Sequence, residues 1–125
     1  MRMSDKQITL GQLIDALDKV PPSTRVYYDW CRVAPASLNS YRGYYEDLAL
    51  GYDCRRGAAC EAGELLKECR GVVNSYLEGY KGGNFRMTRK TPVWCANYGS
   101  ATGWGVVGIV VDEYSVTLKT ALIDP

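Results

Sequence analysis

The sequence predicts an α+β fold in which a single antiparallel or mixed sheet of four to five strands is covered by two helices. Two segments carry apolar residues at helical spacing, and the C-terminal third is rich in β-branched residues and glycine. The chain has 125 residues, of which 46% are hydrophobic and 23% are charged. This composition fits one soluble domain over residues 1–125 that buries a core without a metal or a disulfide.

The first helix is predicted from about residue 10 to residue 19, where leucines and an isoleucine recur on one helical face. Thr9 and Gln12 have the spacing of a capping box, which favours a helix start at this point. Pro21 and Pro22 end the helix, because the residue before a proline is pushed out of helical angles. The β-branched and aromatic residues of Arg25–Trp30 then predict a strand.

The middle of the chain is predicted to contain a loop, a strand and a second helix. Residues 31–43 hold proline, glycine, serine and asparagine without periodicity, which indicates a loop. Residues 46–52 alternate well enough for a strand, and residues 53–60 form an exposed connection. The helical stripe of residues 62–77 predicts a helix that ends at Gly79, or at the glycine pair just beyond it.

The C-terminal third is predicted to supply the remaining strands. Thr91–Tyr98 opens after a proline region and suits a strand, and the apolar run 103–111 suits a second one. The segment 114–123 alternates and suits a third strand, joined to the second by a turn at Asp112 and Glu113.

The run SYRGYYEDLALGY, residues 40–52, is the strongest candidate for a binding site. Its tyrosines offer flat rings with a polar tip, and Arg42 offers a planar cation suited to phosphate or carboxylate. Alternation along a strand sends some of these tyrosines to the core. The plain alternative is that Arg42 pairs with Glu46 or Asp47 and only closes the loop.

Two later segments add candidate contacts. The segment EGYKGGNFRMTRKTP places Tyr80 and Lys81 before a glycine pair, a combination that can hold phosphate but that also fits a helix C-cap and a solvated turn. The segment NYGSATGWG places Asn97 and Tyr98 at a strand end. It is either a flexible hairpin loop or a lid over a pocket.

Catalysis has little support in the composition. The chain has no histidine, so a thiol nucleophile would lack its usual base and a zinc site would need four irregularly spaced cysteines. A metal site and a cofactor are therefore not predicted. Of the five cysteines, three are expected to be small buried hydrophobes: Cys31, Cys69 and Cys95.

Charge and hydropathy limit the partners. Fifteen basic and fourteen acidic residues leave a net charge of +1, which gives no general attraction for duplex nucleic acid or an anionic membrane. The longest apolar stretch is too short to span a bilayer, and the N-terminus lacks the apolar run of a signal peptide. A cytoplasmic protein is expected.

The motif blocks SYRGYYEDLALGY, GELL, EGYKGGNFRMTRKTPVW and ANYG resemble a family of small proteins encoded by tailed bacteriophages and prophages. The resemblance covers about residues 10–110, and the segment 53–60 departs from it. It implies a counter-defence protein in the bacterial host cytoplasm that sequesters a nucleotide-derived immune signal, such as a cyclic ADP-ribose derivative or a cyclic dinucleotide. It also implies a homo-oligomer.

The leading hypothesis is therefore a non-enzymatic protein that binds a small nucleotide-derived ligand. The alternatives are a protein inhibitor of a host defence or nuclease protein, and a nucleotide-acting enzyme with Glu46 or Asp47 as base. The predicted ligand-binding residues are Tyr41, Arg42, Tyr44, Tyr45, Glu46, Tyr80, Lys81, Asn97 and Tyr98.

Overall fold

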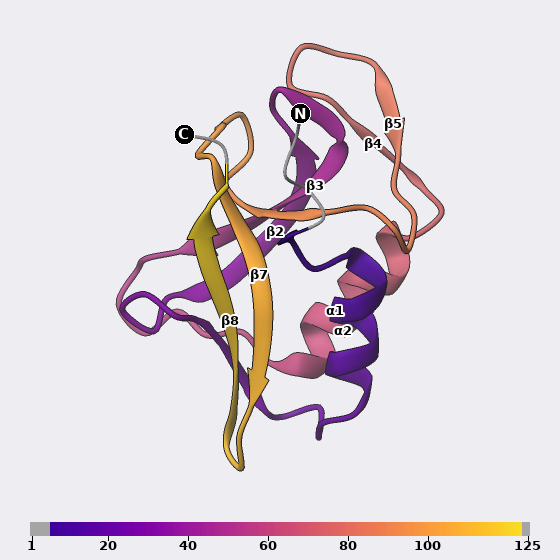
Figure 1. The fold of residues 1–125 in the computed structure, drawn as a ribbon. Helices are drawn as coiled ribbons and strands as arrows, with labels where there is room; N and C mark the ends of the chain where they lie inside the picture. Colours follow the sequence, from indigo (N-terminus) through magenta and orange to yellow (C-terminus); the bar gives the residue numbers. More distant parts are fainter. Residues whose placement is uncertain (1–5, 124–125) are drawn as a thin grey trace.

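The computed structural model describes residues 6–123, which form two sheets and two helices (Figure 1). Along the larger sheet the strands lie in the order β1 (Arg25–Tyr28), β8 (Ser115–Leu122), β7 (Trp104–Val111), β6 (Val93–Cys95), β3 (Tyr44–Asp53) and β2 (Ala34–Tyr41). The pairs β1–β8 and β3–β6 are parallel, and the other pairs are antiparallel. A separate hairpin joins β4 (Tyr76–Glu78) to β5 (Asn84–Arg86).

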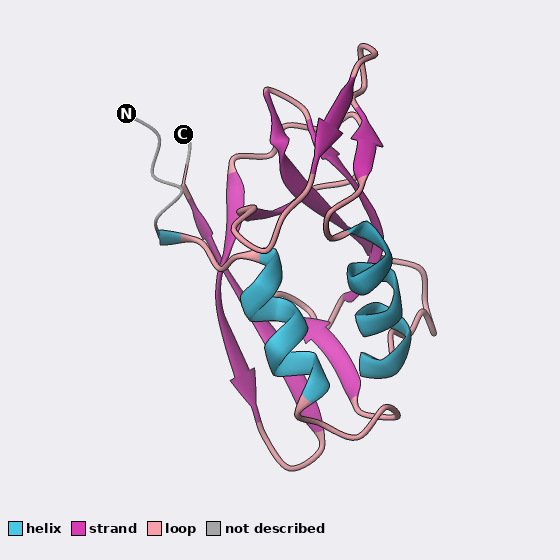
Figure 2. Cartoon of the chain, turned by 90° about the vertical axis from the view of Figure 1, so that its right-hand side faces the viewer, coloured by secondary structure: helices cyan, strands magenta, loops and turns pink. Residues whose placement is uncertain are grey.

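The prediction of one sheet with four to five strands was wrong. The fold is mostly sheet, with six strands in a mixed and nearly barrel-like sheet and two more in the small hairpin. The curvature brings the two edge strands together, since β1 and β2 are joined by a tight turn in which the Tyr28 N–H donates to the Val33 carbonyl at 2.8 Å. The two helices, α1 (Leu10–Asp18) and α2 (Ala62–Val72), lie beside the sheet (Figure 2).

Helix α1 confirms the prediction made from the capping box. The Gln12 N–H donates to the Thr9 hydroxyl at 3.2 Å, and the Thr9 N–H donates to Gln12 Oε1 at 2.9 Å. Leu10, Leu13 and Leu17 are fully buried on the inner face of the helix. Their burial, more than intrinsic propensity, stabilises this nine-residue helix.

Helix α2 is shorter than predicted, because it ends at Val72 and does not continue to residue 77. Asn74 has a φ of 63°, in the left-handed region, and turns the chain away from the helix axis. The residues that follow form β4, which pairs with β5. Gly82 and Gly83, both at positive φ, form the turn between them.

Strand β2 replaces the loop predicted over residues 31–43. It is an edge strand that pairs only with β3, and its register shifts between Pro35 and Leu38. Proline is tolerated at the edge of a sheet or at an irregularity, because no hydrogen bond of the ladder is then lost. The absence of alternation in the sequence therefore reflects an irregular edge strand.

Both faces of the sheet are buried near β3 and β6. Leu48 and Leu50 of β3 belong to the main core beneath the helices, whereas Ala49 between them packs on the opposite face with Tyr41 and Trp94. The indole N–H of Trp94 donates to Asp47 Oδ2 at 2.8 Å in this second cluster. Three consecutive residues of one strand thus serve two cores.

Candidate functional site

Three of the predicted ligand-binding residues come together at one place on the surface. Arg42 lies in the turn between β2 and β3, and its Nη1 donates to the carbonyl of Gly99 at 3.2 Å. Its guanidinium carbon lies 4.9 Å from the ring centroid of Tyr80, and the Tyr80 ring meets the edge of Tyr98 at 5.8 Å. We call Arg42, Tyr80 and Tyr98 the arginine cluster.

This arrangement depends on Gly99, whose φ is 84°. A Cβ at this position would lie 2.8 Å from the Tyr80 ring, so only glycine lets the ring approach. Arg42 is exposed and points to this loop. Arg42 thus contacts the Gly99 carbonyl and the Tyr80 ring, which differs from the pairing with Glu46 or Asp47 that the sequence also allowed.

Tyr41 and Tyr44 lie on the sheet face that holds the second core. The Tyr41 ring stacks on Trp94 at 4.3 Å and is only 2% exposed, and its hydroxyl accepts from the Gly103 N–H at 2.8 Å. Tyr44 is half-buried against the same tryptophan, at 5.8 Å. Tyr41 therefore offers no ring face to a ligand in this conformation.

The remaining predicted residues are dispersed. The Tyr45 ring stacks on Phe85 of β5 at 5.1 Å, which holds the small hairpin against β3. Asn97 Oδ1 accepts from the Tyr52 N–H at 2.9 Å, so this oxygen supports the backbone. Glu46 and Lys81 are exposed.

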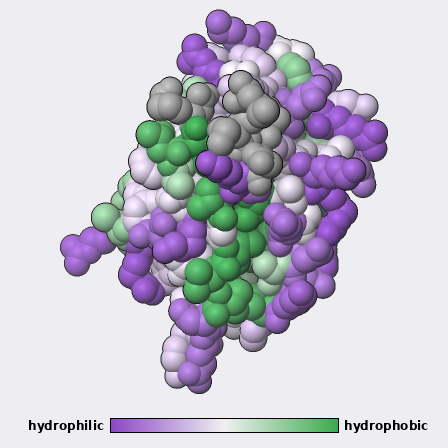
Figure 3. Space-filling view, in the orientation of Figure 1, coloured by the Kyte–Doolittle hydropathy of each residue, from purple (hydrophilic) through white to green (hydrophobic). Residues whose placement is uncertain are grey.

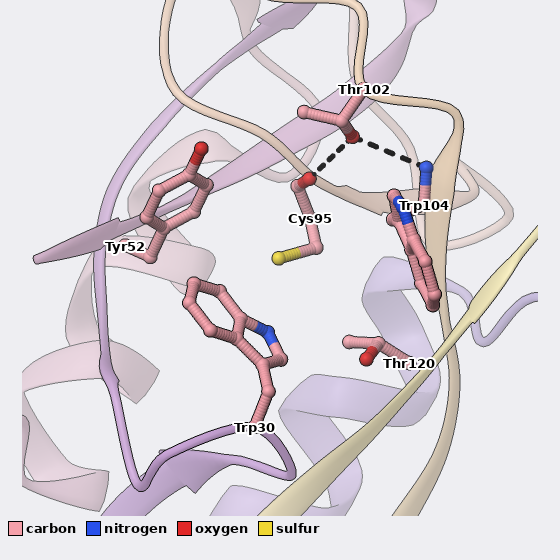
Figure 4. Close-up of a pocket in the computed structure, with 6 residues that line it drawn as sticks. All are labelled: Trp30, Tyr52, Cys95, Thr102, Trp104 and Thr120. Atoms are coloured by element: carbon pink, nitrogen blue, oxygen red, sulfur yellow. Dashed lines mark hydrogen bonds between the residues drawn. The ribbon is translucent and has the colours of Figure 1, made fainter. Parts of the chain in front are cut away.

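A separate pocket of about 290 Å³ lies between the sheet and its loops, and none of the nine predicted residues lines it (Figure 4). Aromatic side chains dominate its walls. The six lining residues are Trp30, Tyr52, Cys95, Thr102, Trp104 and Thr120. We call this the aromatic pocket.

The aromatic walls come from three distant parts of the chain. Trp30 follows β1, at the start of a turn in which Cys31 and Arg32 have φ values of 56° and 50°. Cys31 is exposed in this turn, so the prediction that it is buried was wrong, whereas Cys69 and Cys95 are buried as predicted. Its ring meets the Tyr52 ring of β3 edge to face, with centroids 5.2 Å apart. Trp104 begins β7 on the other side of the pocket and is 46% exposed.

The polar groups of the pocket are largely engaged within the protein. The Thr102 hydroxyl donates to the Cys95 carbonyl at 2.7 Å and accepts from the Trp104 N–H at 3.2 Å. The Thr120 hydroxyl donates to Asp29 Oδ1 at 2.7 Å. Burial raises the pKa of the Cys95 thiol to about 11, so it is protonated at neutral pH and inert as a nucleophile.

The sequence reasoning missed this pocket. Trp30 and Trp104 stand at the end and the start of strands, and a large aromatic residue next to a turn was an available signal. The partners of these residues could not be predicted, because Trp30 comes close to Thr120 and Trp104 only once β8 has paired with both β1 and β7. No sequence spacing reports such a pairing.

Within residues 6–123, no group of three or more His, Cys, Asp or Glu side chains is arranged to hold a metal ion. None of the described helices is long and apolar enough to cross a bilayer. A groove between α1 and β7 is lined in part by Ala16, Val20, Ile109 and Val111, where Figure 3 shows apolar surface.

Comparison of the chain with known protein families, with curated proteins and with solved structures found no match in any of the three.

Proposed function

We propose that this protein binds, without converting it, a small molecule that carries a flat ring, and that the ring enters the aromatic pocket. The observation that carries the proposal is the convergence of Trp30, Tyr52 and Trp104 on one pocket. Stacking of a base on an aromatic side chain contributes about 1–3 kcal/mol, and it depends on the ring face more than on its substituents.

The biological role proposed with this binding is sequestration of a nucleotide-derived immune signal by a phage protein in the bacterial host cytoplasm. The resemblance of the motif blocks to phage proteins suggests this role. At about 290 Å³ the pocket suits one ring system, so the ribose and phosphate of such a ligand would lie outside it. Arg42 is the exposed cation that we propose for the phosphate, either within one chain or across a homo-oligomer.

Binding without conversion is supported by the chemistry of the pocket. The thiol of Cys95 is protonated at neutral pH, and the part of the lining that the structure describes includes no carboxylate or amine that could act as general acid or base. Recovery of intact ligand after heat denaturation of the complex tests this point, because an enzyme would return a product.

Isothermal titration against nucleosides, cyclic dinucleotides and ADP-ribose derivatives tests the proposed binding. Trp104→Ala should weaken binding by about 5-fold to 150-fold, since it removes one stacking wall. Tyr114→Ala is the matched control, because Tyr114 is 79% exposed and does not line the pocket. Equal affinity of wild type and Trp104→Ala for every bound ligand would exclude the pocket as the binding site.

The phosphate part of the proposal has its own variants. Arg42→Ala should weaken binding of a nucleotide while leaving its nucleoside unaffected, and Arg56→Ala serves as an exposed arginine control. If Arg42→Ala leaves nucleotide binding unchanged, the arginine cluster has no role in holding phosphate.

A second candidate function is inhibition of a host defence or nuclease protein. The apolar groove between α1 and β7 favours it, because Val111 is 51% exposed at the groove. Pull-down from host lysate should then recover one stoichiometric partner with the wild type and with Trp104→Ala, but not with Val111→Asp. Recovery by Val111→Asp as well would exclude the groove as the contact surface.

A further inference from the structure

The charge around the aromatic pocket indicates which kind of ring it accepts, an inference that rests on the proposed function. Among residues 6–123, no lysine or arginine lines the pocket. The face of an aromatic ring carries the negative part of its quadrupole, which attracts cations placed over it. An anion placed among these faces would be desolvated without a counter-charge.

Asp29 adds a negative charge behind the Thr120 wall. Its Oδ1 accepts from the Thr120 hydroxyl at 2.7 Å and its Oδ2 from the Thr120 N–H at 3.0 Å, which fixes the carboxylate next to the lining. The side chain of Asp29 is 20% exposed, so water screens it only in part.

The cation of Lys119 lies near this carboxylate. Lys119 Nζ is 4.0 Å from Asp29 Oδ2, at the outer limit of an ion pair, and its side chain is 52% exposed and does not line the pocket. Burial is the main cause of the raised pKa of the Cys95 thiol; hydrogen bonds with Tyr28 and Trp30 lower it, and the nearby Asp29 carboxylate raises it.

The hydroxyl groups support the same preference. Both threonine hydroxyls already donate their hydrogens to protein oxygens, so toward a ligand they act as acceptors. An acceptor lining suits a ligand that carries N–H groups or a positive charge.

We propose that the aromatic pocket selects flat rings that are cationic or neutral over rings that are anionic. A positively charged nitrogen heterocycle, such as an N-alkylated pyridinium, is the ring class that fits it best. In a nucleotide-derived ligand this would be the base or pyridinium end, with every phosphate outside the pocket.

Three probes that share one ring test this selection: 1-methylnicotinamide is a cation, nicotinamide is neutral and nicotinate is an anion at neutral pH. Quenching of tryptophan fluorescence, together with isothermal titration, gives the affinity of each. We expect the cation to bind at least about tenfold more tightly than the anion, with the amide between them. Equal affinities, or tightest binding of nicotinate, would overturn the inference and leave the proposed function standing.

Asp29→Asn should reduce the difference in affinity between 1-methylnicotinamide and nicotinate, while its affinity for the neutral nicotinamide should stay the same. Asp18→Asn is the matched control, because Asp18 pairs with Arg70 on the helices and lies outside the pocket lining. If Asp29→Asn prefers the cation as strongly as the wild type does, the charge of Asp29 does not contribute to the selection. If none of the three probes binds the wild type, the inference fails. The proposed function fails only if the nucleosides, cyclic dinucleotides and ADP-ribose derivatives named above do not bind either.

Discussion

Tyr28→Phe probes the contact that ties strand β1 to strand β3 across the curved sheet. Tyr28 is 1% exposed, and its hydroxyl is within 2.8 Å of the Leu50 carbonyl and 3.0 Å of the Gly51 carbonyl. The substitution removes one oxygen and keeps the ring, so it leaves almost no cavity. Any loss of stability therefore reports the hydrogen bond alone.

The size of the effect follows from the acceptors. A buried hydrogen bond contributes about 0.5–1.5 kcal/mol net, and a carbonyl left without a donor costs more. The Leu50 carbonyl keeps a second donor, the Ala96 N–H at 3.0 Å. We expect Tyr28→Phe to lower the free energy of unfolding by about 1–2 kcal/mol, or the Tm by about 4–8 °C for a chain of this size.

Urea unfolding followed by circular dichroism and by tryptophan fluorescence measures this change, with the m-value expected to stay constant. Tyr76→Phe is the control, because Tyr76 is 64% exposed, and its effect should stay within about 0.5 kcal/mol. If the two variants are equally stable, the Tyr28 hydroxyl does not hold β1 to β3 and the reasoning about closure of the sheet is refuted.

Three further predictions concern the helix cap, the thiols and alkaline pH. Thr9→Ala should destabilise the protein by about 1 kcal/mol in the same unfolding assay, while Thr9→Ser, which keeps the capping hydroxyl, should match the wild type. Equal losses of stability in the two variants would show that the Thr9 hydroxyl does not stabilise the helix. A thiol reagent should label Cys31 and Cys54 rapidly in the native protein and all five cysteines in urea, and rapid labelling of a third thiol would contradict the burial pattern. Burial raises the pKa of Cys60 and Cys69 to about 12 and that of Cys95 to about 11, and it raises the pKa of Tyr28. The thiols of the unfolded chain lose their protons at about pH 8.5, so the free energy of unfolding should be highest below that pH and fall as the pH rises toward the pKa values of the folded state. The expected loss is up to about 1.4 kcal/mol per pH unit for each thiol. A free energy of unfolding, measured with urea under reducing conditions, that stays constant from about pH 8 to about pH 10.5 would contradict this prediction.

Local signals in the sequence predicted the elements whose stability depends on neighbours in the chain. Helix α1 was predicted because its cap and its apolar face lie within twelve residues, and the β7–β8 hairpin because Asp112 forms its turn locally. Strand β2 could not be predicted in this way. Its hydrogen bonds go to β3 at an irregular edge, and its composition is that of a loop.

The candidate sites were likewise predicted only in part from the sequence. Arg42, Tyr80 and Tyr98 were singled out by residue type, and they do lie together. The stacking of Tyr41 on Trp94 was not predicted. Alternation along a strand indicates which residues share a face of the sheet, but it does not show that both faces are buried, as they are here.

The sequence by itself determined the local features of this protein: the capped first helix, the alternating C-terminal strands and the residue types available for binding. Only the tertiary structure decided that Trp30, Tyr52 and Trp104 share one pocket and that Asp29 lies behind it. The physical reason is that periodicity and capping act over a few residues, whereas the pairing of β1 with β8 joins positions about ninety residues apart through the burial of a shared core.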